Sequence, residues 1–348
     1  MEKIEVKHSS GKYMIYAGED ILAPALSEFF GGLERPYDRV FIVSETNVFP
    51  LHGERVKEII SLTGADISGE YVFDAGERSK NLATVSGMYD SFAKAKLTRK
   101  SLVVCLGGGV TGDMGGFAAA TYLRGIDVLQ IPTTLLSQID SSIGGKTGVD
   151  LSVGKNLVGA FHQPVAVISD SRFLDTLPGR FIDDGMGEAI KTGCISDAGL
   201  FEGVAKKTIG RGEMISKCAA FKADVVTKDE FETGLRKILN YGHTIGHAVE
   251  KLGNFERFSH GESVGIGMLY AARVGERLGY KPLFDEIKSA LCAWELPTVM
   301  DYPAQELIKA ASSDKKRTGD SVSFVLLEDI GRPVVREIPI NELGGLIV

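Results

Sequence analysis

The chain has 348 residues, a length that favours two domains over one small core. Its formal net charge of −7 and the absence of a basic stripe argue against nucleic-acid binding. The sequence has no apolar run long enough to cross a membrane and no signal-peptide pattern at its start, so we expect a cytoplasmic protein that does not bind a membrane. The scattered cysteines predict buried thiols rather than disulfides: Cys105, Cys194, Cys218 and Cys292.

The first half of the chain alternates predicted strands and helices. Residues 4–6 and 12–16 predict a hairpin. Four further strands are predicted at 39–43, 69–73, 101–106 and 128–131, with helices from about residue 48, at 81–95 and after the strand at 101–106. This alternation predicts an α/β, Rossmann-like domain over residues 1–177, whose parallel sheet binds ligands at the carboxyl ends of its strands.

Residues 107–113 read Gly-Gly-Gly-Val-Thr-Gly-Asp, directly after a buried strand and at the start of a helix. Glycines there would let the backbone approach a pyrophosphate, whose charge a helix N-terminus favours. The spacing departs from the G-x-G-x-x-G pattern, so a purely structural tight turn is the alternative. Residues 132–156 then predict a long loop whose Ser, Thr, Lys and Asn side chains would donate to phosphate and sugar hydroxyl groups.

Helical periodicity dominates after Pro178. Helices are predicted at 181–195, 212–226, 262–278, 283–293 and 304–311, and a terminal hairpin at 322–327 and 334–338. We therefore predict a mainly α-helical domain over residues 178–348 and expect it to pack closely on the first domain, with the active site between them.

The segment 239–250 holds two of the six histidines. If it is one continuous helix, Arg236, Asn240, His243 and His247 project from the same face, a row suited to a metal and an anionic substrate. A His-x-x-x-His pair also occurs by chance, and this one lacks the Glu that follows the first His in zinc-peptidase helices. A core pair without metal is therefore the alternative.

Ser259 and Glu262 form a capping-box pattern, which predicts a helix start with His260 in its first turn. This third imidazole could meet the preceding helix, and a carboxylate would complete an open metal site. Glu188 and Lys191 lie one helical turn apart among small and apolar neighbours. A surface ion pair is the alternative for them, whereas a buried Glu188 would need a partner such as a metal.

Several blocks occur together and in order between about residues 77 and 330. They are 107–113, 118–125, 132–149, 154–164, 185–193, 235–250 and 259–267. Together they resemble the 3-dehydroquinate synthase family of the sugar-phosphate cyclase superfamily. The resemblance implies an α/β NAD-binding domain, an all-α metal-binding domain and a homodimer.

The resemblance also implies a role for individual residues. The ligands of a divalent zinc or cobalt ion would be Glu188, His243 and His260, whereas His247, Glu232 and Lys191 would be catalytic. The expected substrate-binding residues are Arg124 (from the neighbouring subunit), Asp140, Lys146, Asn156, Lys191, Lys222, Arg236, Asn240, His247 and one of Lys315 and Lys316. The expected NAD contacts are Glu45, Asn47, Glu77, Lys80, Gly109, Asp113, Thr133, Thr134, Lys155, Phe173 and Thr176.

Two departures from the family pattern affect the expected site. Glu45 stands where Asp is common at the adenosine ribose, and its longer carboxylate should still accept two hydroxyl groups. Gly187, Ala189 and Thr192 replace residues that are usually larger around the metal-binding glutamate, which predicts a looser helix.

The implied reaction converts 3-deoxy-D-arabino-heptulosonate 7-phosphate to 3-dehydroquinate and phosphate, with transient oxidation by NAD, phosphate elimination, reduction, ring opening and aldol closure. One alternative is another sugar-phosphate cyclase, but the presence of Lys222, Arg236, Asn240 and His247 favours a substrate with a carboxylate. A metal-dependent NAD polyol dehydrogenase is a second alternative and would show net NADH turnover. A non-catalytic binding module is a third.

Overall fold

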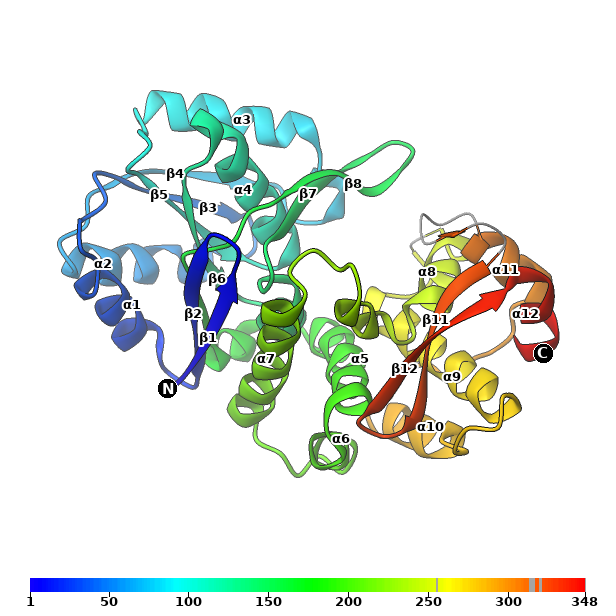
Figure 1. Cartoon of the computed structure of the whole chain (residues 1–348). Coiled ribbons are helices and arrows are strands. Elements are labelled where there is room, and N and C mark those ends of the chain that lie inside the picture. The colour runs from blue at the N-terminus through cyan, green and yellow to red at the C-terminus, as the bar shows by residue number, and fades with distance from the viewer. Residues whose placement is uncertain (255, 313–316, 319–320, 348) are drawn as a thin grey trace. The chain divides into compact units, whose positions relative to one another are not determined.

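The computed structural model describes residues 1–254, 256–312, 317–318 and 321–347 (Figure 1). The chain divides into two units, Met1–Leu177 with Lys222–Phe231, and Pro178–Phe221 with Glu232–Val348. The predicted division into residues 1–177 and 178–348 differs from this one in the segment Lys222–Phe231. Side chains of that segment bind the first unit: Thr227 Oγ1 accepts from the Lys7 amide at 3.1 Å, and Glu230 accepts from the Ser9 amide at 2.8 Å. These long-range contacts leave no signal in the local sequence.

The first unit is built on a seven-stranded sheet with the order β1-β2-β9-β6-β5-β3-β4. Its strands are β1 Glu2–His8, β2 Gly11–Gly18, β3 Val40–Glu45, β4 Ile67–Phe73, β5 Leu102–Gly107, β6 Asp127–Pro132 and β9 Ala166–Asp170. Only β1 is antiparallel to its neighbour, so the predicted hairpin and the predicted parallel sheet are both confirmed. The sequence analysis missed β9, a short apolar run that periodicity alone cannot assign to a strand.

Helices cover both faces of this sheet (Figure 1). On one face pack α1 (Leu22–Gly31), which was not predicted, and α2 (Glu54–Leu62), which follows a π-helical turn. On the other face pack α3 (Leu82–Lys94) and α4 (Gly109–Thr121). The α3 helix begins where the side chain of Asn81 accepts a hydrogen bond from the Thr84 amide, a standard N-cap. This is the doubly wound arrangement that the strand and helix alternation predicts.

Residues 132–156 do not form the long loop that was predicted. A π-helical turn at Ser137–Ser141 is followed by a separate hairpin of β7 (Lys146–Leu151) and β8 (Gly154–Phe161). Gly148 pairs with Gly159 across this hairpin, and a Cβ on Gly159 would lie 2.1 Å from the Thr147 carbonyl oxygen. The small residues that suggested a loop therefore allow the backbones of two strands to lie close together.

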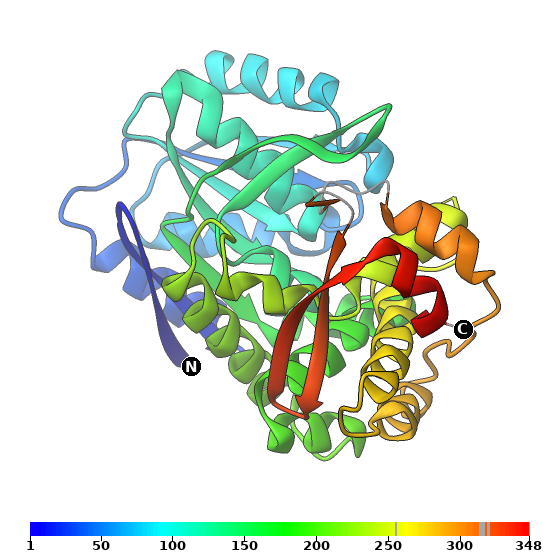
Figure 2. The same cartoon turned by 45° about the vertical axis from the view of Figure 1, so that its right-hand side comes forward.

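The second unit is mainly helical, as predicted. Its elements are α5 Gly179–Ser196, α6 Ala198–Ala205, α7 Arg211–Lys228 (whose last turns belong to the first unit), α8 His243–Leu252, α9 His260–Arg277, α10 Phe284–Ala293, α11 Ala304–Ser312, α12 Ile340–Ile347 and the strands β10 Arg317–Thr318, β11 Ser321–Asp329 and β12 Arg332–Pro339. The predicted terminal hairpin is β11–β12, and β11 lies against α9 (Figure 2). The short helices α6 and α12 were not predicted.

The predicted single helix through residues 236–250 is wrong. Leu235–Asn240 is a 3₁₀-helix, and α8 begins only at His243. Between them, Gly242 has φ +79°, a left-handed conformation that glycine adopts without a Cβ penalty. Arg236 and Asn240 therefore do not share a helix face with His243 and His247, and only the two histidines lie on α8.

Glycines let three helices of this unit approach one another through their backbones. A Cβ on Gly187 of α5 would lie 2.3 Å from the carbonyl oxygen of Gly261 in α9. A Cβ on Gly267 of α9 would lie 1.9 Å from the carbonyl oxygen of Gly242, next to the start of α8. The prediction that Gly187 loosens α5 is therefore wrong, because this residue permits close packing of α5 on α9.

Two further expectations concern burial. Cys105, Cys194 and Cys218 are buried as predicted, whereas Cys292 in α10 is exposed, because its position on that helix does not face the core. Within the described residues, we find no helix that combines the length and apolarity needed to cross a bilayer.

The glycine packing predicts a local stability difference within α9. We expect Gly267→Ala to lower the free energy of unfolding by about 1–3 kcal/mol, since the new methyl group must displace backbone of the preceding segment. Gly275→Ala in the same helix is the control. Its Cβ would lie 3.9 Å from Tyr280, so alanine should be neutral or should stabilise the helix by up to about 1 kcal/mol. Equal unfolding transitions for the two variants in urea would contradict the packing argument.

Candidate active site

Glu188 and Lys191 lie one turn apart on α5, and both side chains are buried. The Lys191 ammonium is 2.5 Å from Glu188 Oε2. The Lys191 side chain is 2% exposed and the Glu188 side chain 1%. A surface ion pair, the alternative considered for these residues, is thereby excluded. Within the described residues, neither carboxylate oxygen of Glu188 accepts a hydrogen bond of normal geometry. A buried carboxylate in this state has capacity for a further cation.

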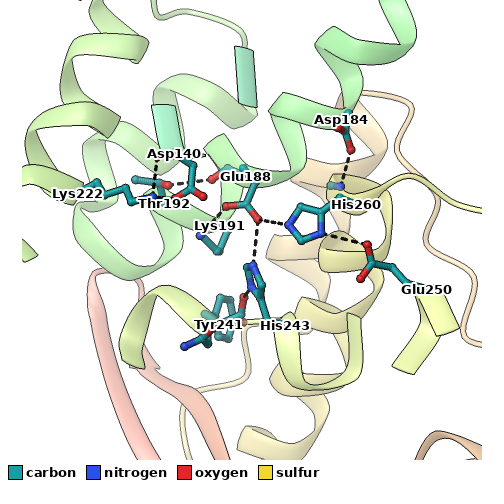
Figure 3. A network of polar contacts seen from close by, with 12 residues as sticks. Asp140, Asp184, Glu188, Lys191, Thr192, Lys222, Tyr241, His243, Glu250 and His260 are labelled. Atoms are coloured by element: carbon teal, nitrogen blue, oxygen red, sulfur yellow. Dashed lines mark hydrogen bonds and ion pairs between the residues drawn. The ribbon is translucent and has the colours of Figure 1, made fainter. Parts of the chain in front are cut away.

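Two imidazoles face the same oxygen of Glu188 (Figure 3). His243 is the first residue of α8 and His260 the first of α9, and each Nε2 lies 3.5 Å from Glu188 Oε1. The opposite ring nitrogens are engaged, since His243 Nδ1 lies 3.2 Å from the Tyr241 carbonyl oxygen and His260 Nδ1 lies 3.1 Å from Glu250 Oε1. Both Nε2 atoms are therefore directed to the carboxylate.

This geometry fits a divalent metal ion. One ligand atom from each of Glu188, His243 and His260 lies within 4.8 Å of the others. Two imidazole nitrogens and one carboxylate oxygen are the donors of an open catalytic zinc site, which leaves a position for water or substrate. The fixed Nδ1 contacts set the tautomer in which Nε2 can coordinate.

Local charges shift the pKa values of these groups. Burial alone would raise the pKa of Glu188, but the Lys191 ammonium and the two imidazoles hold it well below its ordinary value. Burial lowers the pKa of His243 well below the usual range. For His260 burial also acts downward, but the neighbouring carboxylates of Glu188 and Glu250 outweigh it and raise the pKa to about 10. The site thus presents an ionised carboxylate, a neutral imidazole and an imidazole that carries a proton when no metal is bound.

His247 lies one turn after His243 on α8, with ring centroids 5.4 Å apart. Together with Glu250 and His260 it forms a second group of possible ligands. This group uses the Nδ1 side of His260, which already contacts Glu250, whereas the first group uses the Nε2 side. The first group fits a metal better, because both of its histidines direct the same nitrogen to one oxygen.

Two acidic residues near these ligands were missed by the sequence analysis. Glu250 contacts His260, and its position three residues after His247 on α8 was the signal that could have revealed it. The Asp184 Oδ1 accepts a hydrogen bond from the Gly261 amide at 2.6 Å, which fixes the start of α9 against α5. Nothing in the local sequence indicates that second contact, because 77 residues separate its partners.

Other predicted substrate residues form pairs within each unit. In the first unit, Lys222 Nζ lies 2.7 Å from Asp140 Oδ1. In the second, Asn240 donates to Glu232 Oε1 at 2.6 Å, and Glu232 has a left-handed φ of +60°. Arg236 is 2% exposed, so its guanidinium is buried rather than solvated.

The remaining predicted substrate residues lie in less confined places. Arg124 is exposed at the end of a short 3₁₀-helix, and Lys146 is the exposed first residue of β7. Lys315 and Lys316 lie outside the described residues.

The glycine run 107–109 connects β5 to α4. A Cβ on Gly107 would lie 2.3 Å from Thr111 Oγ1, and one on Gly109 would lie 3.0 Å from Ser141 Oγ. The turn itself therefore requires glycine at its first position, so the structural alternative explains part of the motif. Thr133 lies next to this turn, because its amide donates a hydrogen bond to the Gly107 carbonyl oxygen. Its Oγ1 is buried and has no hydrogen-bond partner among the described residues.

The predicted cofactor residues gather at the carboxyl edge of the parallel sheet. Glu45 ends β3, Thr133 and Thr134 follow β6, and Phe173 and Thr176 lie in the turn after β9. The Glu45 carboxylate accepts from the Asn47 amide at 2.7 Å, which fixes its direction beyond the strand end. A doubly wound sheet binds its ligand at this edge. An unsatisfied hydroxyl and a glycine turn at the same edge fit a dinucleotide.

Five residues beside this edge form polar contacts with one another. Lys80, 5% exposed, contacts Asp113 Oδ2 and Asn156 Oδ1, each at 2.7 Å. Lys155, on the same hairpin as Asn156, lies 3.6 Å from Glu77 Oε1. The residues predicted to contact the cofactor thus also hold one another and the β7–β8 hairpin in place.

Comparisons with known proteins agree with this geometry. The family model described as 3-dehydroquinate synthase N-terminal matches residues 70–184, and the model described as 3-dehydroquinate synthase C-terminal matches residues 185–317. The 3-dehydroquinate synthase of Clostridium acetobutylicum is 42% identical over 98% of this chain and 98% of its own length. That of Citrifermentans bemidjiense is 44% identical over 88% of this chain and 87% of its own.

A solved structure extends the likeness to the fold. The crystal structure of 2-deoxy-scyllo-inosose synthase complexed with carbaglucose-6-phosphate, NAD+ and Co2+ covers 99% of both chains, with a TM-score of 0.84 and 25% identity. The family models cover well over half of the chain and follow each other without a gap. The chain belongs to the 3-dehydroquinate synthase family.

Proposed function

We propose that this protein is a 3-dehydroquinate synthase, a carbon–oxygen lyase that converts 3-deoxy-D-arabino-heptulosonate 7-phosphate to 3-dehydroquinate and phosphate. The observation that carries the proposal is the convergence of His243 Nε2 and His260 Nε2 on one buried oxygen of Glu188, in a chain of this family. Such a donor set suits the oxidation of a bound hydroxyl group, the step that prepares phosphate for elimination.

The cofactors of the proposed reaction are NAD and a divalent zinc or cobalt ion. Glu188, His243 and His260 would hold the metal, and residues at the carboxyl ends of β3, β6 and β9 would hold NAD. The metal supplies a Lewis acid for the substrate hydroxyl groups, and NAD supplies a reversible hydride acceptor. The solved relative that is 25% identical contains NAD+ and Co2+, which supports this assignment.

Cationic side chains of this chain would bind and orient the anionic groups of the substrate. Lys191 is buried beside Glu188, so its ammonium lies at the metal site and cannot be hydrated fully. Arg236 is likewise buried and offers a planar group suited to a carboxylate or phosphate. Orientation of both ends of the substrate makes the successive steps intramolecular in effect.

His247 and Glu232 are the proposed proton carriers. His247 faces the ring of His243 and stands outside the Glu188 ligand group, which places an imidazole beside the proposed metal site without making it a ligand there. The Glu232 carboxylate is oriented by the donor group of Asn240. We assign both residues to proton transfer and neither of them to metal binding.

The names of the relatives decide between the cyclases. Relatives at 42–44% identity are 3-dehydroquinate synthases, whereas the solved 2-deoxy-scyllo-inosose synthase, with carbaglucose-6-phosphate bound, is 25% identical. A homodimer in the cytoplasm is a further proposal. The exposed position of Arg124 supports it, since a residue that reaches a neighbouring subunit must lie at the surface. Size-exclusion chromatography with light scattering tests the dimer.

An activity assay separates the lyase from a polyol dehydrogenase. Purified protein with the heptulosonate phosphate, NAD and Zn2+ should release one phosphate per substrate with no lasting absorbance of NADH, because the reaction returns the hydride to its own intermediate. Glucose 6-phosphate, which lacks the carboxylate, serves as the control substrate and should release none. Steady accumulation of NADH would contradict the proposed function.

Metal analysis tests the ligand set. We expect His243→Ala and Glu188→Gln to lose the bound metal and activity, because each removes one of the three donors. His247→Ala should keep the metal and lose activity by about 10²- to 10⁴-fold, the usual contribution of a general acid or base. Metal retained by the first two variants, or lost from the third, would contradict the assignment.

The protonation state of His260 predicts how metal affinity depends on pH. In the metal-free protein the pKa of His260 is about 10, so this imidazole carries a proton at neutral pH. The pKa values of His243 and Glu188 lie well below their ordinary values, so neither group holds a proton that the metal must displace. One proton, that of His260, must therefore leave on metal binding. The dissociation constant should fall about tenfold per pH unit from about pH 7 to about pH 9. A competing chelator, corrected for its own protonation, measures this slope. An affinity that does not change with pH would contradict the assigned charge states.

A further inference from the structure

Glu250, to which the proposed mechanism gives no role, lies next to the metal site (Figure 3). It is near the end of α8, it is 7% exposed, and its Oε1 is 3.1 Å from His260 Nδ1. The contact joins the end of α8 to the start of α9. A carboxylate buried to this degree costs free energy unless it accepts hydrogen bonds, so its place beside an imidazole needs a reason.

The contacts that hold the backbone of His260 are different from those that reach its ring. The capping box of Ser259 and Glu262 fixes the first turn of α9, and Asp184 binds the Gly261 amide. None of these contacts restricts rotation of the His260 side chain, which is 32% exposed. Glu250 contacts the ring on the side opposite Glu188.

The two histidine ligands differ in the partner of Nδ1. His243 Nδ1 lies against a neutral carbonyl oxygen, that of Tyr241, whereas His260 Nδ1 lies against a carboxylate. A carboxylate acceptor makes an imidazole a stronger donor to a metal than a carbonyl does, and it also fixes the ring and the tautomer. It further adds a negative charge close to the cation.

We propose that Glu250 is a positioning residue of the metal site: it accepts the Nδ1–H of His260 and so directs the Nε2 lone pair to the metal beside Glu188. It does not bind the metal itself, because its oxygen lies on the far side of the ring from Glu188. This inference rests on the proposed metal site at Glu188, His243 and His260.

The test compares metal affinity in Glu250→Ala, Glu250→Gln and the parent protein, by titration of the metal-free full-length chain with Co2+ against a chromophoric chelator. Glu250→Ala should weaken binding by about 10- to 100-fold. Glu250→Gln keeps an oxygen that can accept the Nδ1–H but removes the charge, so it should weaken binding by less than Ala does. Saturating Co2+ should restore kcat in both variants, because Glu250 acts through the metal and not on substrate.

Glu256→Gln is the matched control, since it removes an exposed carboxylate just after α8 and should leave affinity unchanged. An Ala variant that binds Co2+ within twofold of the parent overturns the inference. If Glu250→Ala does not fold, a Gln variant equal to the parent overturns it instead. Two Co2+ ions per parent chain and one in either variant also overturn it, because Glu250 would then be a ligand in the group of His247, Glu250 and His260.

The same titration separates this inference from the proposed function. His243→Ala serves as the reference for loss of the metal site. If the parent binds no Co2+, or if His243→Ala binds it as tightly, the metal site itself is wrong. If those two behave as expected but Glu250→Ala is unchanged, only the role of Glu250 fails.

Discussion

The buried carboxylate of Glu188 is the charge around which the second unit is arranged. Its desolvation is unfavourable by itself, and it is offset by the ammonium of Lys191 and by two imidazoles that face one oxygen. An arrangement built for stability alone would place apolar side chains here, since a buried ion pair rarely outperforms good packing. The buried charge, with two imidazole nitrogens beside it, is therefore best explained by the binding of a cation.

The positions of the three proposed metal ligands depend on contacts between backbones. Glu188, His243 and His260 come from three different helices, and side chains at the crossing points would hold these helices apart. Gly187, Gly261 and Gly267 remove that obstacle, because a Cβ on any of them would lie within 2.3 Å of a carbonyl oxygen on the neighbouring element. Overpacking at such points moves a helix by amounts that a metal site does not tolerate. The glycines of the second unit thus serve the chemistry as much as the glycine turn of the first unit does.

The first unit follows a different principle. Its parallel strands end at one edge, and the topology brings the residues after β3, β6 and β9 together there. The polar network of Lys80, Asp113 and Asn156 then holds the β7–β8 hairpin beside this edge. The proposed cofactor site is set largely by strand order, whereas the proposed metal site is set by individual helix contacts.

The sequence by itself determined the parallel sheet, the helical second half, the capping box at Ser259 and the identity of the candidate ligands, because these follow from local periodicity and from motifs in a fixed order. It also suggested a continuous helix through Arg236 and His247 and a long loop at 132–156, and both were wrong. Only the tertiary structure decided these points, since the left-handed Gly242 and the Gly148–Gly159 pair both depend on close contact with backbone that is distant in the sequence. The contact of Glu250 with His260 could not be predicted for the same reason. The partner of a buried charge is set by the tertiary packing, and the local sequence does not indicate which group that partner is.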